Sequence, residues 1–97
     1  MQSPLTKTLQ ALADPTRRQI LHMLAEKDLS AGEIGAEFNI TAPSISHHLN
    51  VLKNAELVIT RREGQSIVYS LNSTVMQEFL QEMMEMFSVG KGKKDAE

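Results

Sequence analysis

Two helix starts follow one another closely in the middle of the chain. Residues 30–33 have the Ser-x-x-Glu spacing of a capping box, and Thr41 precedes a first helical turn that contains Pro43. The helix that starts at Ser30 ends near Asn39. Only about two or three residues separate it from the helix that starts at Thr41, which reaches about Ala55. A turn this short holds the second helix steeply across the first. The spacing therefore predicts a helix-turn-helix.

Two more helices are predicted before this pair. Leu5, Leu9 and Leu12 are spaced i, i+4, i+7, which places them on one face of a short helix. Asp14 is suited to cap a second helix, and Pro15 suits its first position because an N–H there would have no helical partner. The inward face of the second helix consists of Ile20, Leu21 and Leu24.

The spacing of apolar residues changes after Glu56. Residues 57–62 and 66–71 alternate with a period of two, and a turn at Glu63-Gly64 joins them, so they predict a β-hairpin. Asn72 or Ser73 caps a last helix that reaches about Val89.

The expected fold is mainly α with a small β-hairpin. It is a winged helix-turn-helix in which four helices precede the hairpin and a fifth follows it. Residues 1–89 form one domain, and residues 90–97 form a polar tail.

The last helix carries more apolar surface than one domain can cover. Its apolar residues lie on more than one face, and they are Val75, Met76, Phe79, Leu80, Met83, Met84, Met86 and Phe87. Together with the apolar face of the first helix, they predict a homodimer; the alternative is that both faces pack inside the monomer. The expected interface residues are Leu5, Leu9, Leu12, Phe79, Met83, Met86 and Phe87.

The composition narrows the class of protein. A chain of 97 residues forms one domain, and a net charge of −2 does not by itself indicate a nucleic-acid partner. The charge is uneven, however, because residues 41–62 carry Lys53, Arg61 and Arg62 against Glu56 alone. No apolar run is long enough to span a bilayer, so we expect a soluble, cytoplasmic protein without membrane insertion.

The helix that starts at Thr41 has two contrasting sides. At 100° per residue, Ile45, Leu49 and Leu52 cluster on one side. The opposite side is small and polar, and it consists of Pro43, His47 and Asn50 with Ser44 and Ser46 beside them.

Several motifs resemble, in the same order, those of the ArsR/SmtB family of bacterial winged-helix repressors. They are Asp14-Pro15-Thr16-Arg17-Arg18, Ser44-Ile45-Ser46-His47-His48-Leu49, Leu57-Val58, Arg61-Arg62-Glu63-Gly64-Gln65 and Tyr69-Ser70-Leu71. The resemblance covers about residues 5–87. Within the family, the chain is most similar to the SdpR-type autorepressor branch.

The resemblance implies a homodimeric repressor whose fourth helices enter successive major grooves of a palindromic operator in double-stranded DNA. Ser46 and His47 are the matched family positions. From side-chain chemistry and position, the expected DNA contacts are Pro43, Ser44, Ser46, His47, Asn50, Lys53, Arg61, Arg62 and Gln65. For Arg17 the sequence leaves open an intramolecular ion pair or a phosphate contact, whereas His48 is expected to pack or bond internally.

The residues offer no metal site and no sign of an enzyme. The chain has no cysteine, and its three histidines are not spaced to chelate one ion, so we predict no metal and no cofactor. A Gly-rich phosphate loop after a strand and hydrolase-like pairs of histidine and carboxylate are also missing. Repression is therefore expected to be relieved by a protein partner, by an organic ligand in the dimer interface, or by autoregulated dosage. The rival function is a winged helix used only for protein contacts.

Overall fold

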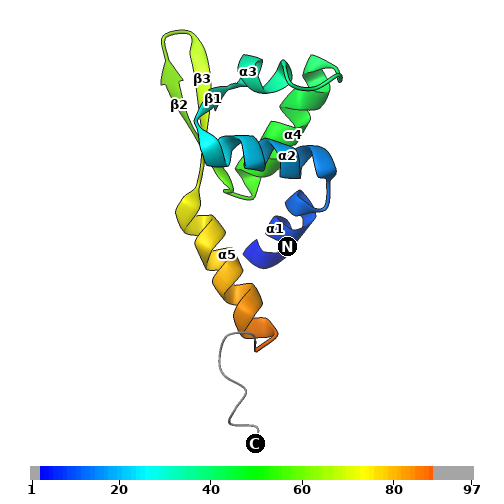
Figure 1. Ribbon diagram of the computed structural model, residues 1–97, viewed down its shortest axis with the longest axis vertical. Helices are drawn as coiled ribbons and strands as arrows, with labels where there is room; N and C mark the ends of the chain where they lie inside the picture. Colours follow the sequence, from blue (N-terminus) through cyan, green and yellow to red (C-terminus); the bar gives the residue numbers. More distant parts are fainter. Residues whose placement is uncertain (1–2, 89–97) are drawn as a thin grey trace, which may run out of the picture.

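A computed structural model describes residues 3–88 (Figure 1). In chain order its elements are α1 (Pro4–Leu12), α2 (Pro15–Glu26), β1 (Leu29–Ser30), α3 (Ala31–Gly35), α4 (Ala42–Asn54), β2 (Val58–Glu63), β3 (Ser66–Leu71) and α5 (Ser73–Met86). The predicted end of the last helix at Val89 and the polar tail 90–97 lie outside the described residues.

Each helix begins at a residue whose side chain accepts a hydrogen bond from one of the free N–H groups of the first turn. The Asp14 carboxylate accepts a hydrogen bond from the Arg17 N–H at 3.1 Å, and the Thr41 hydroxyl accepts one from the Ser44 N–H at 3.2 Å. At α3 both bonds of the capping box are present: the Glu33 N–H donates to the Ser30 hydroxyl, and the Ser30 N–H donates to the Glu33 carboxylate. The predicted helix starts are therefore confirmed, and of the two candidates for α5 the cap is Asn72.

The structure differs from the expectation at three places. Helix α3 ends at Gly35, and turns replace the stretch expected to stay helical to Asn39. The hairpin turn is one residue later than predicted, at Gly64-Gln65, because Glu63 still pairs with Ser66. Strand β1 was not predicted, since two residues are too few to show a period in the sequence.

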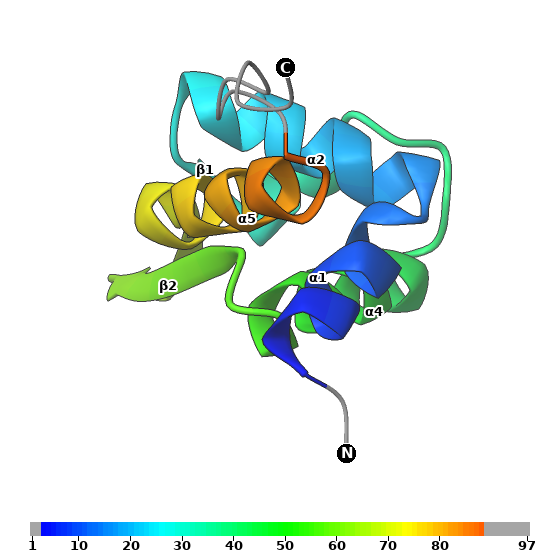
Figure 2. The ribbon, with the colours of Figure 1, turned by 90° about the horizontal axis from the view of Figure 1, so that it is seen from below.

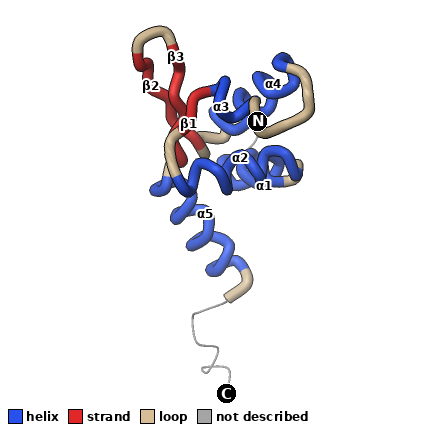
Figure 3. Tube along the Cα trace, turned by 45° about the horizontal axis from the view of Figure 1, so that its top comes forward, coloured by secondary structure: helices blue, strands red, loops and turns tan. Residues whose placement is uncertain are grey.

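The three strands form one antiparallel sheet in the order β1-β3-β2 (Figure 3). Leu29 of β1 pairs with Tyr69, and Arg61 of β2 pairs with Val68 of the central strand. Gly64 has a φ of 62° at the first of two turn positions, which is the place where type II′ hairpin turns require glycine. The two-residue turn fixes the register, so Arg61 and Arg62 lie on opposite faces of the hairpin.

A single core joins α2, α3 and α4 to the base of the hairpin. Its largest fully buried side chains are Ile20, Ile34, Leu49, Leu52, Leu57 and Val58. The end of α4 is closed by two hydrogen bonds, from the Leu57 N–H to the Leu52 carbonyl and from the Glu56 N–H to the Lys53 carbonyl. This is a Schellman motif, in which Glu56 adopts a φ of 62° and Leu57 packs into the core beside Leu52. The motif directs the chain from α4 into the hairpin.

Helix α5 projects away from this core. In Figure 1 it extends below the other elements, while α4 and the hairpin lie in the upper half. None of its residues is buried, and the molecule measures 58 × 26 × 22 Å. Within residues 3–88, no helix has the length and apolar character needed to cross a membrane.

Candidate nucleic-acid interface

The exposed side of α4 forms a narrow polar strip. Ile45, Leu49 and Leu52 are buried beneath it, as the helical period predicts. The residues of this strip, which we call the α4 strip, are exposed, and they are Pro43, Ser46, His47, Asn50 and Lys53. Ser44 is half-buried on the flank of the helix and does not share this strip.

His48 and Arg17 join three helices. The Arg17 guanidinium donates from Nε to the Ala11 carbonyl at 2.8 Å and from Nη2 to the Gln10 carbonyl at 3.1 Å, both near the end of α1. Its Nη1 lies 3.2 Å from Nδ1 of His48 on α4. Because a guanidinium only donates, Nδ1 accepts, and the neutral ring of His48 carries its proton on Nε2. Arg17 is thus an internal hydrogen-bond donor, and the internal bond expected for His48 is confirmed.

Asp14 completes this junction between α1, α2 and α4. Its carboxylate lies 3.8 Å from His48 Nδ1 and caps α2. Burial raises the pKa of the Asp14 carboxyl, but the hydrogen bond from the Arg17 N–H and the positive charge beside the carboxylate outweigh this effect, so the net pKa is lowered. The carboxylate therefore stays ionised and keeps the start of α2 fixed against α4.

The hairpin presents its two arginines differently. Arg62 is exposed, lies on the face opposite Arg61 and forms no ion pair within the described part of the chain. Gln65 is exposed at the turn. Arg61 instead lies between two carboxylates, with Nε 2.8 Å from Glu63 Oε2 and Nη1 2.7 Å from Asp28 Oδ2.

Asp28 was not among the residues singled out from the sequence. It directly precedes β1, and only the pairing of β1 with β3 brings it near the hairpin. The hydrogen bond from Arg61 lowers the pKa of the Asp28 carboxyl, with a smaller contribution from Ser70. Local sequence patterns carry no signal for a contact that depends on an unpredicted strand.

The residues expected at a subunit interface lie on α1 and at the end of the molecule that α5 forms, away from the hairpin (Figure 1). Seen from that end, α1 and α5 lie in front of the other elements (Figure 2). Leu9, Met86 and Phe87 are exposed by 43%, 51% and 63%, so the isolated chain leaves a large part of this surface uncovered. The other four expected residues are half-buried, and they are Leu5, Leu12, Phe79 and Met83. Leu80 and Met84, which the expected interface omitted, are also exposed.

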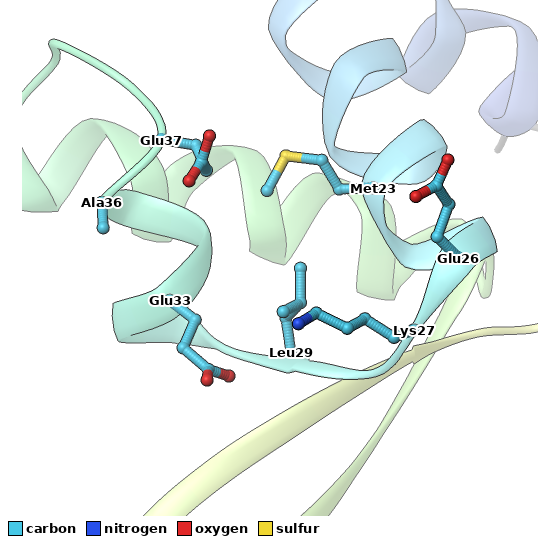
Figure 4. Close-up of a pocket in the computed structure, with 7 residues that line it drawn as sticks. All are labelled: Met23, Glu26, Lys27, Leu29, Glu33, Ala36 and Glu37. Atoms are coloured by element: carbon cyan, nitrogen blue, oxygen red, sulfur yellow. The ribbon is translucent and has the colours of Figure 1, made fainter.

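A pocket of about 420 Å³ lies between α2, β1 and α3 (Figure 4). Met23 and Leu29 supply its apolar lining. Three carboxylates also line it against the single ammonium of Lys27, and they belong to Glu26, Glu33 and Glu37. This charge balance disfavours the binding of a phosphate in the pocket.

Comparisons with known proteins identify the family. Residues 14–60 match the family model described as "Bacterial regulatory protein, arsR family". The transcriptional repressor SdpR of Bacillus subtilis (strain 168) is 48% identical over 86 residues, which are 89% of this chain and 96% of that protein. The chain belongs to the arsR family of bacterial regulatory proteins. The family predicted from the motifs is therefore confirmed.

Solved structures of arsR-family regulators share the fold. An ArsR-like transcriptional regulator from Rhodococcus sp. RHA1 superposes with a TM-score of 0.80 at 26% identity, covering 96% of this chain and 87% of that one. The homodimeric winged helix-turn-helix DNA-binding domain of a protein from Mycobacterium bovis gives 0.71 at 27% identity, covering 86% and 78%. The predicted winged helix-turn-helix is confirmed. The family is one of transcriptional regulators, so the chain is a regulator and not an enzyme.

The hydrogen bonds of Arg17 predict a difference between two neighbouring arginines. Arg17→Ala removes three side-chain bonds across helix junctions, and we expect it to lower the free energy of unfolding by about 1.5–3 kcal/mol. Arg18→Ala removes one exposed bond to the Leu12 carbonyl and should cost less than about 1 kcal/mol. Urea denaturation at one fixed protein concentration measures both. Equal losses for the two variants would show that Arg17 does not hold the helices together.

Proposed function

We propose that this arsR-family regulator is a homodimeric repressor that binds a palindromic operator in double-stranded DNA, with α4 in the major groove. The observation that carries the proposal is the α4 strip: five small or polar side chains stand exposed on a helix whose other side is buried in the core. The B-DNA major groove admits a helix of this kind. The repressor role is supported by the similarity to SdpR.

The side chains of the α4 strip suit base edges and phosphates. Asn50 has the paired donor and acceptor that match adenine, and Ser46 bonds to either base edges or phosphates. His47 donates to a phosphate or a guanine acceptor. Lys53, in the last turn, is suited to a phosphate contact. Pro43 and the half-buried Ser44 lie at the start of the helix, where they are proposed to approach the backbone.

The hairpin is the proposed wing. Arg62 and Gln65 are exposed at its outer end and are proposed to contact phosphates or the adjacent minor groove. Arg61 is proposed as a weaker contact, since two carboxylates compete for its guanidinium.

The dimer is proposed to form through α1 and α5. Along α5, the apolar side chains of residues 75–87 cover about half of the helix circumference at 100° per residue, while Gln77, Gln81 and Glu85 occupy the other half. A twofold interface over this surface covers side chains that the single chain leaves in solvent. The homodimeric structural neighbour from Mycobacterium bovis supports this assembly. Two α4 helices would then meet half-sites about 34 Å apart.

The inducer in this proposal is a protein partner or an organic ligand, acting in the cytoplasm. The chain has no cysteine, and within residues 3–88 no three histidine or carboxylate groups are placed to hold a metal ion. Repression of its own gene is the proposed regulatory circuit. The rival function, a winged helix that only contacts other proteins, predicts no preference among DNA sequences.

The proposal predicts that Ser46→Ala combined with His47→Ala reduces operator affinity by about tenfold or more, because both side chains lie on the α4 strip. The test uses DNA selected by the wild-type protein from random duplexes, followed by a shift assay at stated salt. The matched control is His22→Ala combined with Thr74→Ala, which removes exposed groups from α2 and α5. Unchanged affinity in the Ser46/His47 variant, or an equal loss in the control, contradicts the helix-in-groove proposal.

The dimer interface has a separate test. Phe87→Glu should convert the dimer to a monomer at micromolar concentration, because it places a carboxylate in the apolar surface of α5. The single chain loses little stability, since Phe87 is already 63% exposed. Gln81→Glu adds the same charge on the polar side of α5 and should leave the dimer intact. Sedimentation equilibrium measures the mass of both variants, and a Phe87→Glu dimer as stable as the wild type would exclude this interface.

A further inference from the structure

The guanidinium of Arg61 uses three of its five N–H donors in hydrogen bonds within the described chain. Its Nε–H donates to Glu63 Oε2 at 2.8 Å. Its Nη1 group donates to Asp28 Oδ2 at 2.7 Å and to the Ser70 hydroxyl at 3.3 Å. Of the five N–H donors of an arginine, only the two on Nη2 remain. A phosphate that approaches Arg61 must share or replace these partners.

The contact with Asp28 depends on the sheet. Asp28 directly precedes β1, Arg61 belongs to β2, and β3 lies between these strands. Ser30 and Arg61 both pair with Val68. Asp28 is two residues from Ser30, and Ser70 is two residues from Val68, so both lie on the face of the sheet that carries Arg61. The ion pair therefore spans the full width of the three-stranded sheet.

The charges of this cluster oppose DNA binding. Two carboxylates surround one guanidinium, so the group of Asp28, Arg61 and Glu63 has a net charge of −1 at neutral pH. Asp28 remains ionised there, because its hydrogen bonds lower the pKa of its carboxyl. Arg62, on the other face of the hairpin, has no such partner within the described residues. One wing arginine is thus available to DNA and the other is restrained.

We propose that Asp28 restrains DNA binding by holding Arg61 away from the phosphate backbone, so that the wing binds DNA more weakly than its two arginines would allow. This inference rests on the DNA-binding function proposed above. The side chains of Arg61 and Asp28 are 48% and 43% exposed, so water and salt reach the pair and a phosphate competes with Asp28 reversibly. Asp28 therefore tunes affinity and its salt dependence without touching the DNA.

The test is Asp28→Asn in the full chain, with a random-sequence duplex of about 30 base pairs as the probe. We expect affinity near 100 mM salt to rise about three- to tenfold, because one cation per subunit becomes available to a phosphate. The slope of log K against log salt should steepen by about 0.9 for each added contact, hence up to about 1.8 for a dimer. Glu63→Gln should act in the same direction.

Glu26→Gln is the matched control, because Glu26 is an exposed carboxylate of α2 that does not bond to Arg61. Unlike Asp28→Asn, Glu26→Gln should leave both the affinity and the slope of log K against log salt unchanged. The gain from Asp28→Asn should also vanish when it is combined with Arg61→Ala. Equal gains in Asp28→Asn and Glu26→Gln, or a gain that survives Arg61→Ala, overturn the restraint. Weaker binding after Asp28→Asn overturns it too, since Asp28 would then orient Arg61 productively. Wild-type protein that binds neither this probe nor selected DNA overturns the proposed function instead.

Discussion

Burial of one side of α4 is the constraint on which the rest of the molecule depends. Ile45, Leu49 and Leu52 pack against α1, α2 and α3, and each buried aliphatic side chain contributes about 1.5–3 kcal/mol. A helix held in this way cannot rotate, so its polar side has one fixed direction. The hydrogen bonds that Arg17 of α2 forms with α1 and with His48 also hold α4 in place at this junction. A rigid helix is a more precise platform for recognition than a loop.

The molecule separates two tasks along its long axis. Helix α4 and the hairpin lie in one half of the molecule, and α5 extends at the other end (Figure 1). Part of the apolar side of α5 is exposed. A partner at the apolar end increases the apolar surface that a small domain buries, and this contact leaves the polar end free. Twofold pairing at one end then sets the distance between the two copies of α4 at the other. Assembly and DNA recognition are coupled through this geometry in the proposed function.

Features that depend on neighbouring residues were predictable from the sequence. The helix caps at Asp14, Ser30 and Thr41 and the buried side of α4 follow from local chemistry and period. Features that depend on distant pairing were not. Strand β1 is visible only once β3 is folded against it, and the restraint of Arg61 by Asp28 depends on that pairing. The sequence does not decide between the two roles of Arg17, because its acceptors, backbone carbonyls of α1, have no sequence signature. The DNA contacts and the interface remain predictions.

Hydroxyl-radical footprinting of the full-length protein on a duplex selected from random DNA tests the central claim most directly. If two copies of α4 enter successive major grooves, protection should appear as two segments related by twofold symmetry, with centres about 10–10.5 base pairs apart on one side of the helix. A single protected segment, or two segments without that symmetry, would contradict the account.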